Sequence, residues 1–191
     1  VESRSGNVLG EYLKNWLMPG TLKVSPDGKQ LCVVHQDDVG LKGSPDSLSF
    51  FQLFDFDNAT GKISDPHTIV SHDYEESATF EYSPDSRFLY VSGSDEQPGG
   101  YFLDQFEARL ATEAKIAASR TRISYCVGSD CNNDFVGMQA APDGKIYLNR
   151  DTTLSVISRP NVKAPGCQLE FDKIGLGGRT SRWLLPSMIN D

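Results

Sequence analysis

A turn motif that occurs three times at a fixed spacing constrains the fold more than any other feature. The copies begin at Ser25, Ser83 and Ala141, and 58 residues separate each from the next. Each copy reads as a small residue, Pro-Asp, a turn residue and a cation, followed by a β-rich run. Proline presets φ at the first central turn position and aspartate can bond its own backbone, so the motif predicts a tight turn. A long fixed period indicates one structural unit repeated so that each copy packs on the next, as in solenoids and propellers.

Each repeat carries the pattern of four strands. In the first repeat, polar and apolar residues alternate over 21–24, and the turn folds the chain back into a second strand at 30–34. A third run covers 48–56, and a return strand begins at residue 63 after a hairpin turn at 57–62. Four antiparallel strands per repeat make a propeller blade. The sequence therefore predicts an all-β fold, a β-propeller of four-stranded antiparallel blades. Residues 1–20 are expected to end a preceding blade, 21–78 and 79–136 to form two blades, and 137–191 to form the last blade and a closing segment.

The second repeat contains the one stretch that also looks helical. Apolar residues recur every four positions from Phe102 onward, and Ala, Glu and Lys are abundant up to Ile123. The repeat argues instead for a third strand at 101–107 and a fourth at 120–126, with a short helical turn around 110–118 between them. Ser86 stands where the other copies have Gly28 and Gly144. We expect a small strain cost there if the position is left-handed.

Three repeats and a fraction do not complete a ring. Closed propellers need at least four blades, and natural proteins avoid exposed sheet edges. We therefore expect upstream residues or another chain to complete the propeller, so that the 191 residues are a cropped or processed piece of a larger one. A complete small four-bladed propeller, with residues 1–20 supplying part of one blade, is the alternative.

Composition excludes two classes of partner. The net charge is −8 and the 18 Lys and Arg residues are spread along the chain without a basic stripe, so nucleic acid is not an expected partner. The hydrophobic content of 38% suffices for a core. No apolar run approaches the roughly 20 residues that span a bilayer, and the first residues resemble neither a signal nor a transit peptide. If the protein is exported, its signal has been removed or lies upstream.

The four cysteines permit three full pairings. Cys126 and Cys131 bracket a turn-forming segment and are a candidate short-loop disulfide, which requires an oxidising compartment. Zinc is the competing interpretation, but the spacing is wide for a ligand pair and no histidine is near. Cys32 lies in a strand pattern and is expected to be a buried small hydrophobe, while Cys167 is either free or paired.

Few residues point to chemistry. Gly177, Gly178 and Arg179, with Arg182 nearby, are a weak candidate for an anion-binding loop. No helix pattern follows the loop, so a structural turn is favoured. Asp55 and Asp57 share a strand face, and Asp37 and Asp38 add further oxygen ligands, so calcium is kept as an alternative to solvated acids beside a turn. No EF-hand spacing is present, and no cofactor or metal site is assigned.

No catalytic residues are assigned either. The histidines, His35, His67 and His72, are accompanied by neither a Gly-x-Ser-x-Gly elbow nor a His-Glu-x-x-His pair. An active site assembled from distant loops around the central channel is the alternative. The chain is therefore interpreted as a non-enzymatic module, with a propeller hydrolase or lyase as the second hypothesis.

The third repeat and the residues after it carry a family resemblance. Over residues 135–188 the motifs follow in a specific order: Met138 to Tyr147, Leu154 to Ile157, Pro160-Asn161, Pro165-Gly166-Cys167, Leu176 to Ser181 and Leu185-Pro186. In this order they resemble the end of a propeller region in large surface proteins of Bacteroidetes. Those proteins are labelled gliding-motility-associated or type IX secretion substrates. The similarity weakens toward the N-terminus.

The resemblance implies an exported protein at the cell surface, associated with the outer membrane or in the periplasm. It implies a binding or structural role in gliding motility, adhesion or type IX secretion assembly, with partners among other envelope proteins or the remainder of the same propeller. It carries over no catalytic residues; the enzyme alternative would act on a surface glycan or peptide. Such proteins usually continue into adhesion-like and sorting domains, whereas this chain stops at Asp191. Ser47 and Thr152 lie in short motifs that resemble O-glycosylation acceptors of Bacteroidetes.

Overall fold

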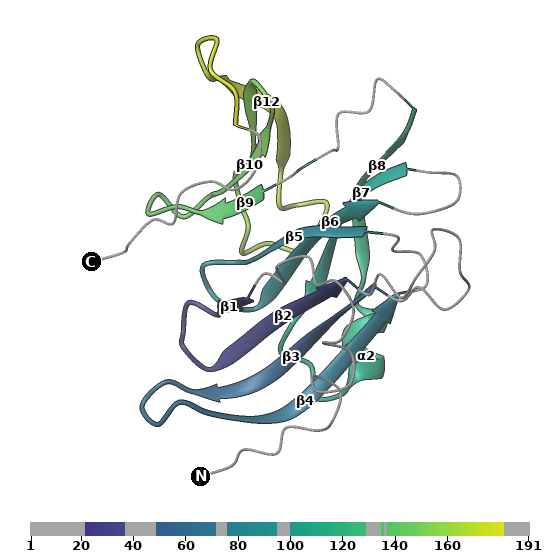
Figure 1. Ribbon diagram of the computed structural model, residues 1–191, viewed down its shortest axis with the longest axis vertical. Helices are drawn as coiled ribbons and strands as arrows, with labels where there is room; N and C mark the ends of the chain where they lie inside the picture. The colour runs from purple at the N-terminus through teal and green to yellow at the C-terminus, as the bar shows by residue number, and fades with distance from the viewer. Residues whose placement is uncertain are drawn as a thin grey trace.

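Three four-stranded antiparallel sheets make up the fold (Figure 1). A computed structural model of the chain describes residues 22–36, 49–71, 76–94, 100–128, 135 and 137–181. In every sheet the strands lie side by side in chain order. The first sheet contains β1 (Leu22–Val24), β2 (Gln30–Gln36), β3 (Ser49–Asp57) and β4 (Lys62–Ser71). The second contains β5 (Glu76–Tyr82), β6 (Phe88–Ser94), β7 (Gly100–Glu107) and β8 (Thr121–Val127), and the third contains β9 (Gly137–Ala140), β10 (Ile146–Arg150), β11 (Thr153–Ile157) and β12 (Leu169–Gly175).

These sheets are the first, second and third blades of a β-propeller module, so the predicted all-β fold of four-stranded blades is confirmed. The sheets span residues 22–71, 76–127 and 137–175. Strand β5 thus begins at Glu76, ahead of the boundary expected at residue 79. The segment 1–20, expected to end a preceding blade, lies outside the described residues.

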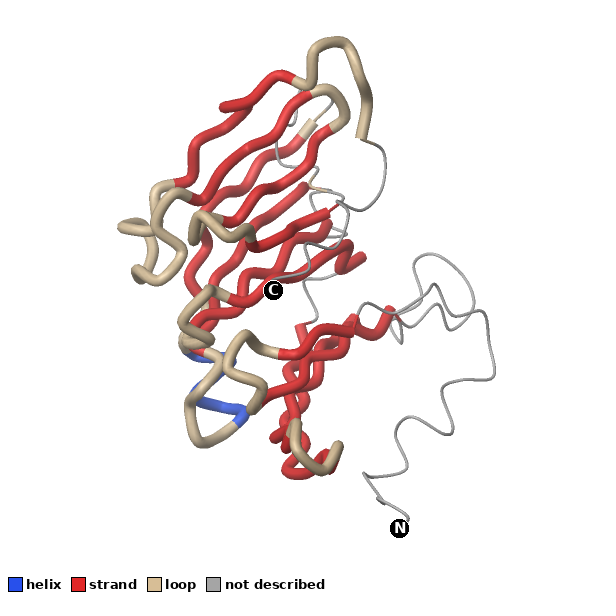
Figure 2. Tube along the Cα trace, turned by 90° about the vertical axis from the view of Figure 1, so that its left-hand side faces the viewer, coloured by secondary structure: helices blue, strands red, loops and turns tan. Residues whose placement is uncertain are grey.

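The helical pattern in the second repeat produces one short helix within the connection between β7 and β8. Helix α2 (Glu113–Ala118) begins after Thr112, whose side-chain oxygen accepts a hydrogen bond from the Lys115 amide. It buries Ile116 in the core and contacts β4 and β7, at the ends of the strands (Figure 2). The predicted order of strand, helical turn and strand is confirmed.

The first two Pro-Asp turns use the same hydrogen bonds. The Ser25 amide donates to the Gln30 carbonyl at 2.8 Å, and the Gln30 amide donates back to the Ser25 hydroxyl at 3.0 Å. Ser83 and Phe88 repeat this exchange. Ser86 has φ 63°, so the left-handed condition under which a strain cost was expected is met. Its hydroxyl accepts a hydrogen bond from the Asp27 amide at 3.0 Å and thereby links the turns of two neighbouring blades.

The third turn is one residue shorter, because Ala141 has no hydroxyl to accept the second hydrogen bond. Its amide donates to the Lys145 carbonyl at 2.9 Å, and strand pairing starts from there. The change shifts the register of the hairpin. In the second blade, Phe80 pairs with Val91. In the third blade, Met138 lies 58 positions after Phe80, but its partner Leu148 lies only 57 positions after Val91. The spacing of the turn motif is therefore constant, whereas the spacing between equivalent residues of the strand after each turn is one residue shorter at the third turn.

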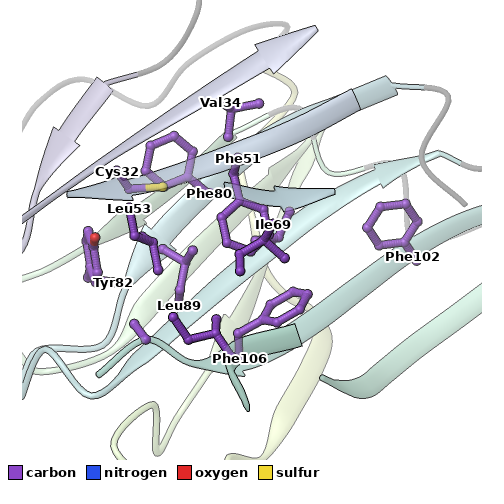
Figure 3. Close-up of a cluster of buried hydrophobic side chains, with 13 residues drawn as sticks. Cys32, Val34, Phe51, Leu53, Ile69, Phe80, Tyr82, Leu89, Phe102 and Phe106 are labelled. Atoms are coloured by element: carbon purple, nitrogen blue, oxygen red, sulfur yellow. The ribbon is translucent and has the colours of Figure 1, made fainter. Parts of the chain in front are cut away.

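Each pair of adjacent blades encloses an apolar core, and alternate residues of β6 point to opposite sides. Leu89 and Val91 face the first blade, whereas Phe88 and Tyr90 face the third. The core between the first two blades is drawn in Figure 3 and includes Phe51 and Phe106, whose rings meet edge to face at 5.1 Å between centroids. The second blade is thus covered on both faces, and the blades stabilise one another by burying these side chains.

The turn aspartates make the fold sensitive to acid. Burial acts to raise the pKa of Asp85, but hydrogen bonds from Ser83 and Arg87 outweigh it and hold the pKa below its usual value. The pKa values of Asp27 and Asp143 are lowered in the same way. An unfolded aspartate titrates at about 3.9. A lowered folded pKa therefore contributes stability that is present above about pH 4 and is lost as the pH falls through the folded pKa.

We expect the free energy of unfolding in urea, followed by circular dichroism, to fall between about pH 5 and pH 3. Asp85→Asn should cost up to about 1 kcal/mol at pH 7, since the site is partly exposed, and should flatten this acid limb. Asp55→Asn is the matched control, because the Asp55 carboxylate has no hydrogen bond to the described residues. An acid limb unchanged by Asp85→Asn would contradict the assignment.

Candidate functional site

The inner strands of the three blades meet at a buried ion pair. Lys23, Glu81 and Gln139 occupy equivalent positions of β1, β5 and β9. The Lys23 ammonium lies 2.6 Å from the Glu81 carboxylate and donates to the Met138 carbonyl at 2.9 Å. The three blades are thus joined through one lysine.

Both oxygens of the Glu81 carboxylate accept hydrogen bonds. Oε2 accepts from Lys23 and from the Ala140 amide at 3.0 Å, and Oε1 accepts from the Tyr82 amide at 3.0 Å. Glu81 is buried. A carboxylate held in this way links strands, because both of its oxygens already accept hydrogen bonds from the protein. A general base must instead lie within hydrogen-bonding distance of a substrate proton.

A second buried carboxylate is equally committed to the fold. Asp104 on β7 is fully buried, and its oxygens accept hydrogen bonds from Nε of Arg120 at 2.8 Å and Nε of Arg122 at 2.5 Å. Both arginines are partly exposed, and the Arg122 guanidinium lies 5.0 Å from the ring centroids of Phe102 and of Tyr125. Sequence reasoning did not single out these residues, because the pairing depends on the strand register.

The histidines do not gather at the inner strands in the described part of the chain. His67 lies on β4, the last strand of the first sheet, with Nε2 3.4 Å from Asp65 Oδ2. His72 lies outside the described residues, and only the backbone of His35 is described.

An open groove lies at the turns of the first blade and extends to a loop of the second. Its volume is about 350 Å³, and it is lined by Lys29, Asp55, Phe56, Asp57, Lys62, Ser64 and Arg109. Lys29 comes from the Pro-Asp turn, Arg109 from the loop after β7, and the remaining five from the β3–β4 hairpin.

Hydrogen bonds and close packing hold the walls of this groove together. The Phe56 amide donates to the Lys29 carbonyl at 2.9 Å, which fastens the β3–β4 hairpin to the Pro-Asp turn. The Asn58 side chain packs on Gly28 so closely that a Cβ there would lie 2.4 Å from Asn58 Nδ2. Gly28 has a left-handed backbone, φ 69°, which the equivalent Ser86 of the second turn also adopts at φ 63°.

Arg109 is anchored on the opposite side. Its guanidinium donates to the Asp27 carboxylate at 2.5 Å, to the Ser25 hydroxyl at 3.2 Å and to the Ser86 carbonyl at 3.1 Å. The groove is therefore built from two turns of one blade and a loop of the next, each tied to its neighbours.

The three turn cations differ in their partners. The Arg87 Nε lies 2.7 Å from Asp85 and the Lys145 Nζ lies 3.0 Å from Asp143, each within its own turn. The equivalent Lys29 forms no ion pair with the described residues, while Oδ1 of its turn aspartate, Asp27, is bound to Arg109.

The hairpin supplies a second free cation. Lys62 also lacks an ion pair among residues the structure describes. Asp57 accepts hydrogen bonds from the Thr60 hydroxyl at 2.7 Å and the Ala59 amide at 3.0 Å, which lower its pKa. The groove thus offers the ammonium groups of Lys29 and Lys62 and the carboxylate of Asp55, none of which forms an ion pair within the described residues, while the charge of Lys62 helps to lower the pKa of Asp57.

The structure describes only two of the four aspartates considered as calcium ligands. Asp55 and Asp57 both line the groove, together with the intervening Phe56. Asp37 and Asp38 lie outside the described residues. Within the described ranges, no three His, Cys, Asp or Glu side chains form a group able to hold a metal ion. The calcium alternative stays a prediction.

The glycine loop forms a tight turn after β12. Gly177 and Gly178 both have positive φ, 62° and 80°, and the Arg179 amide donates to the Leu176 carbonyl at 3.2 Å. Two successive left-handed residues are what such a turn demands, which supports the structural interpretation. Arg182, the second cation of the anion-loop hypothesis, lies outside the described residues, so anion binding there stays a prediction.

The remaining candidate residues are scattered. Thr152 lies in the β10–β11 turn, where its carbonyl accepts the Leu176 amide at 2.9 Å, and its side chain is exposed. Ser47 lies outside the described residues. Glycosylation of either residue stays a prediction.

The cysteines divide into buried thiols and a strand-edge residue. Cys32 and Cys167 are free, and burial raises the pKa of both. The expectation for Cys32 as a buried small residue is confirmed. Cys126 lies on β8 and is not a free cysteine. Its expected partner Cys131 lies outside the described residues, so the pairing of the two stays a prediction.

Of the helices in the described ranges, none is long and apolar enough to cross a membrane. No family model matches the chain, and no curated protein matches it. The resemblance to Bacteroidetes surface proteins therefore stays a prediction.

Solved structures do show similarity. The periplasmic gluconolactonase PpgL of Pseudomonas aeruginosa is 19% identical with a TM-score of 0.46, covering 74% of this chain and 41% of its own length. Hydrazine synthase of Kuenenia stuttgartiensis is 19% identical with a TM-score of 0.40, covering 80% of this chain and 36% of its own. The chain therefore spans about two fifths of the length of these proteins, and at such identities the likeness concerns the fold alone.

Proposed function

We propose that this chain is a non-enzymatic β-propeller module for binding and scaffolding in an exported, Bacteroidetes-type cell-surface protein. The role would be in gliding motility, adhesion or type IX secretion assembly. The motif order over residues 135–188 supports the assignment to such a protein, and with it an exported location. The engagement of Glu81 in three hydrogen bonds between inner strands supports a non-catalytic role for the centre of the module.

The observation that carries the scaffold role is an open apolar edge on the first blade. Leu22 and Val24 on β1 are 58% and 41% exposed. Phe80 and Tyr82 hold the same register positions in the second blade and are completely buried against the first. Leu31 and Phe54, on the same face but on β2 and β3, are buried, so the open part is limited to the inner strand.

The partner that fits this edge is a further four-stranded blade of the same propeller. The face that is open in the first blade is the face by which the second and third blades pack on their predecessors. A preceding blade with apolar residues on its facing side would repeat these two interfaces. Exposed apolar residues whose equivalents are buried between two other blades are typical of an interaction surface.

We expect Leu22→Asp to change the free energy of unfolding by different amounts in the isolated chain and in the native protein. In the 191-residue chain the side chain already faces water, so the free energy of unfolding should change by less than about 0.5 kcal/mol. In the native full-length protein the same change should cost about 2–4 kcal/mol, because a charge would be buried without a partner. Val127→Asp on β8, where Val127 is 51% exposed, is the control and should be mild in both. Equal effects of Leu22→Asp in both proteins would contradict the docking of a blade.

The cellular role is tested in a Bacteroidetes host that carries the native gene. Surface biotinylation of intact cells should label the protein, and deletion should impair spreading on agar or the release of secreted proteins. The native protein should also have a mass well above 21.0 kDa. Retention in the cytoplasm, or a deletion strain with normal spreading and normal secretion, would overturn the proposal.

A further inference from the structure

We infer that the groove of the first blade is a binding site for an acidic sugar. This inference rests on the proposed binding role and assigns it a site and a class of ligand. The site is made of Lys29, Lys62 and Asp55, with Phe56 and Ser64 between them.

The free charge of Lys29 sets the first blade apart from the other two. Its equivalents Arg87 and Lys145 are neutralised within their own turns at 2.7 Å and 3.0 Å. Arg109 reaches across from the next blade and binds Oδ1 of Asp27, and the Lys29 ammonium forms no ion pair in the described part of the chain. This ammonium and that of Lys62, which also forms no ion pair in the described residues, line one groove and together make a site for an anion, in a protein whose net charge is −8.

In the second blade the equivalent charged groups are engaged. Glu107 stands there in the position of Asp55, since both pair with the residue that directly follows the turn cation. Its carboxylate lies 2.6 Å from Lys163 Nζ, while Arg87 also donates to the Asn161 carbonyl. The groove is therefore a local departure from the repeat and not a consequence of it.

The other lining groups restrict the anion. The carboxylates of Asp55 and Asp57 would repel a ligand of high negative charge density, so a sugar with one carboxylate per ring is favoured over a polyphosphate or nucleic acid. Asp55 has unused acceptor oxygens for ligand hydroxyl groups, and Ser64 can donate or accept. The half-buried Phe56 supplies an apolar surface.

A carboxylate combined with hydroxyl groups and an apolar ring face describes a hexuronic acid. The volume of about 350 Å³ is at the lower end for small-molecule sites. Because the walls are fixed by the Phe56 to Lys29 hydrogen bond and by Asn58 on Gly28, little ordering is required when a ligand binds.

The test is a titration with digalacturonate, followed by protein and ligand NMR, with cellobiose as the neutral probe. We expect saturable binding of digalacturonate at least tenfold tighter than that of cellobiose, with shifts at residues 55–64. The double variant Lys29→Gln/Lys62→Gln should weaken binding at least tenfold. Lys145→Gln, which removes the ion-paired equivalent, should leave it unchanged. Circular dichroism verifies that each variant is folded.

Salt gives an independent measurement on the unaltered protein. Binding through two ammonium groups should weaken severalfold between low and high sodium chloride, because exposed charges are screened. No saturation with digalacturonate, equal affinity for cellobiose, or an affinity unaffected by both the double variant and salt would each overturn the site. Cleavage of digalacturonate during the titration would instead overturn the non-enzymatic role, while the variants still decide the location of the site.

Discussion

Replacing Glu81 with alanine is expected to destabilise the protein by about 3 kcal/mol, because breaking a buried ion pair leaves the other charge uncompensated. The Lys23 ammonium would lose its partner at 2.6 Å, and the amides of Ala140 and Tyr82 would lose an acceptor. Lys23 keeps 23% of its side chain exposed and can recover some hydration, which places the expected cost at the lower end for such pairs. The effect should be large because one residue links three blades.

The measurement is a urea double-mutant cycle with Glu81→Ala and Lys23→Ala. We expect a coupling energy of about 1–2 kcal/mol between the two positions. Glu107→Ala is the matched control, since Glu107 pairs with Lys163 at the surface and such pairs contribute less than about 1 kcal/mol. If Glu81→Ala and Glu107→Ala cost the same, the inner pair does not fasten the blades.

The architecture was predictable because local chemistry repeats. Pro-Asp turns at a constant spacing determine where each blade starts, and strand alternation reveals which residues face the neighbouring blade. The left-handed Ser86 followed from its alignment with Gly28 and Gly144. The helix between β7 and β8 was located because its helical periodicity conflicted with the repeat.

The third hairpin shows the limit of the repeat argument. Its motif starts 58 residues after the second, yet its strand pairing is shifted by one residue. The cause is a single missing hydroxyl at Ala141, which decides where the turn closes. The spacing between motifs gives only their positions in the chain. The register of strand pairing depends on which residues form the hydrogen bond that closes the turn.

The candidate site was only partly visible in the sequence. Asp55 and Asp57 were noticed as a pair of acids on one strand face, which suggested calcium. The cations opposite them come from elsewhere in the chain: Lys29 from the turn before β2 and Arg109 from the next blade. Arg109 is held there by the carboxylate of Asp27, 82 residues away. A contact between such distant residues depends on tertiary structure and has no local signature.

The largest loss of stability is expected for Phe106→Ala, and it too depends on contacts between distant parts of the chain. Phe106 is 2% exposed in the core between the first and second blades, in edge-to-face contact with Phe51 at 5.1 Å (Figure 3). Removing a buried phenylalanine costs about 3–5 kcal/mol, as the transfer free energy of the ring plus the cavity that is left. Because Phe51 belongs to the first blade and Phe106 to the second, the change should weaken the docking of the blades and not a single sheet.

Urea unfolding monitored by circular dichroism measures the loss, and native-state hydrogen exchange locates it. We expect protection to fall in β2, β3, β5 and β6 together, since strands that share one core open as a unit. Phe171→Ala is the control: that ring is 44% exposed and stacks on Phe135, so it should cost about 1 kcal/mol or less. If Phe106→Ala lowers protection only in β7, each sheet is stable by itself, and the cores between blades are not what holds the propeller together.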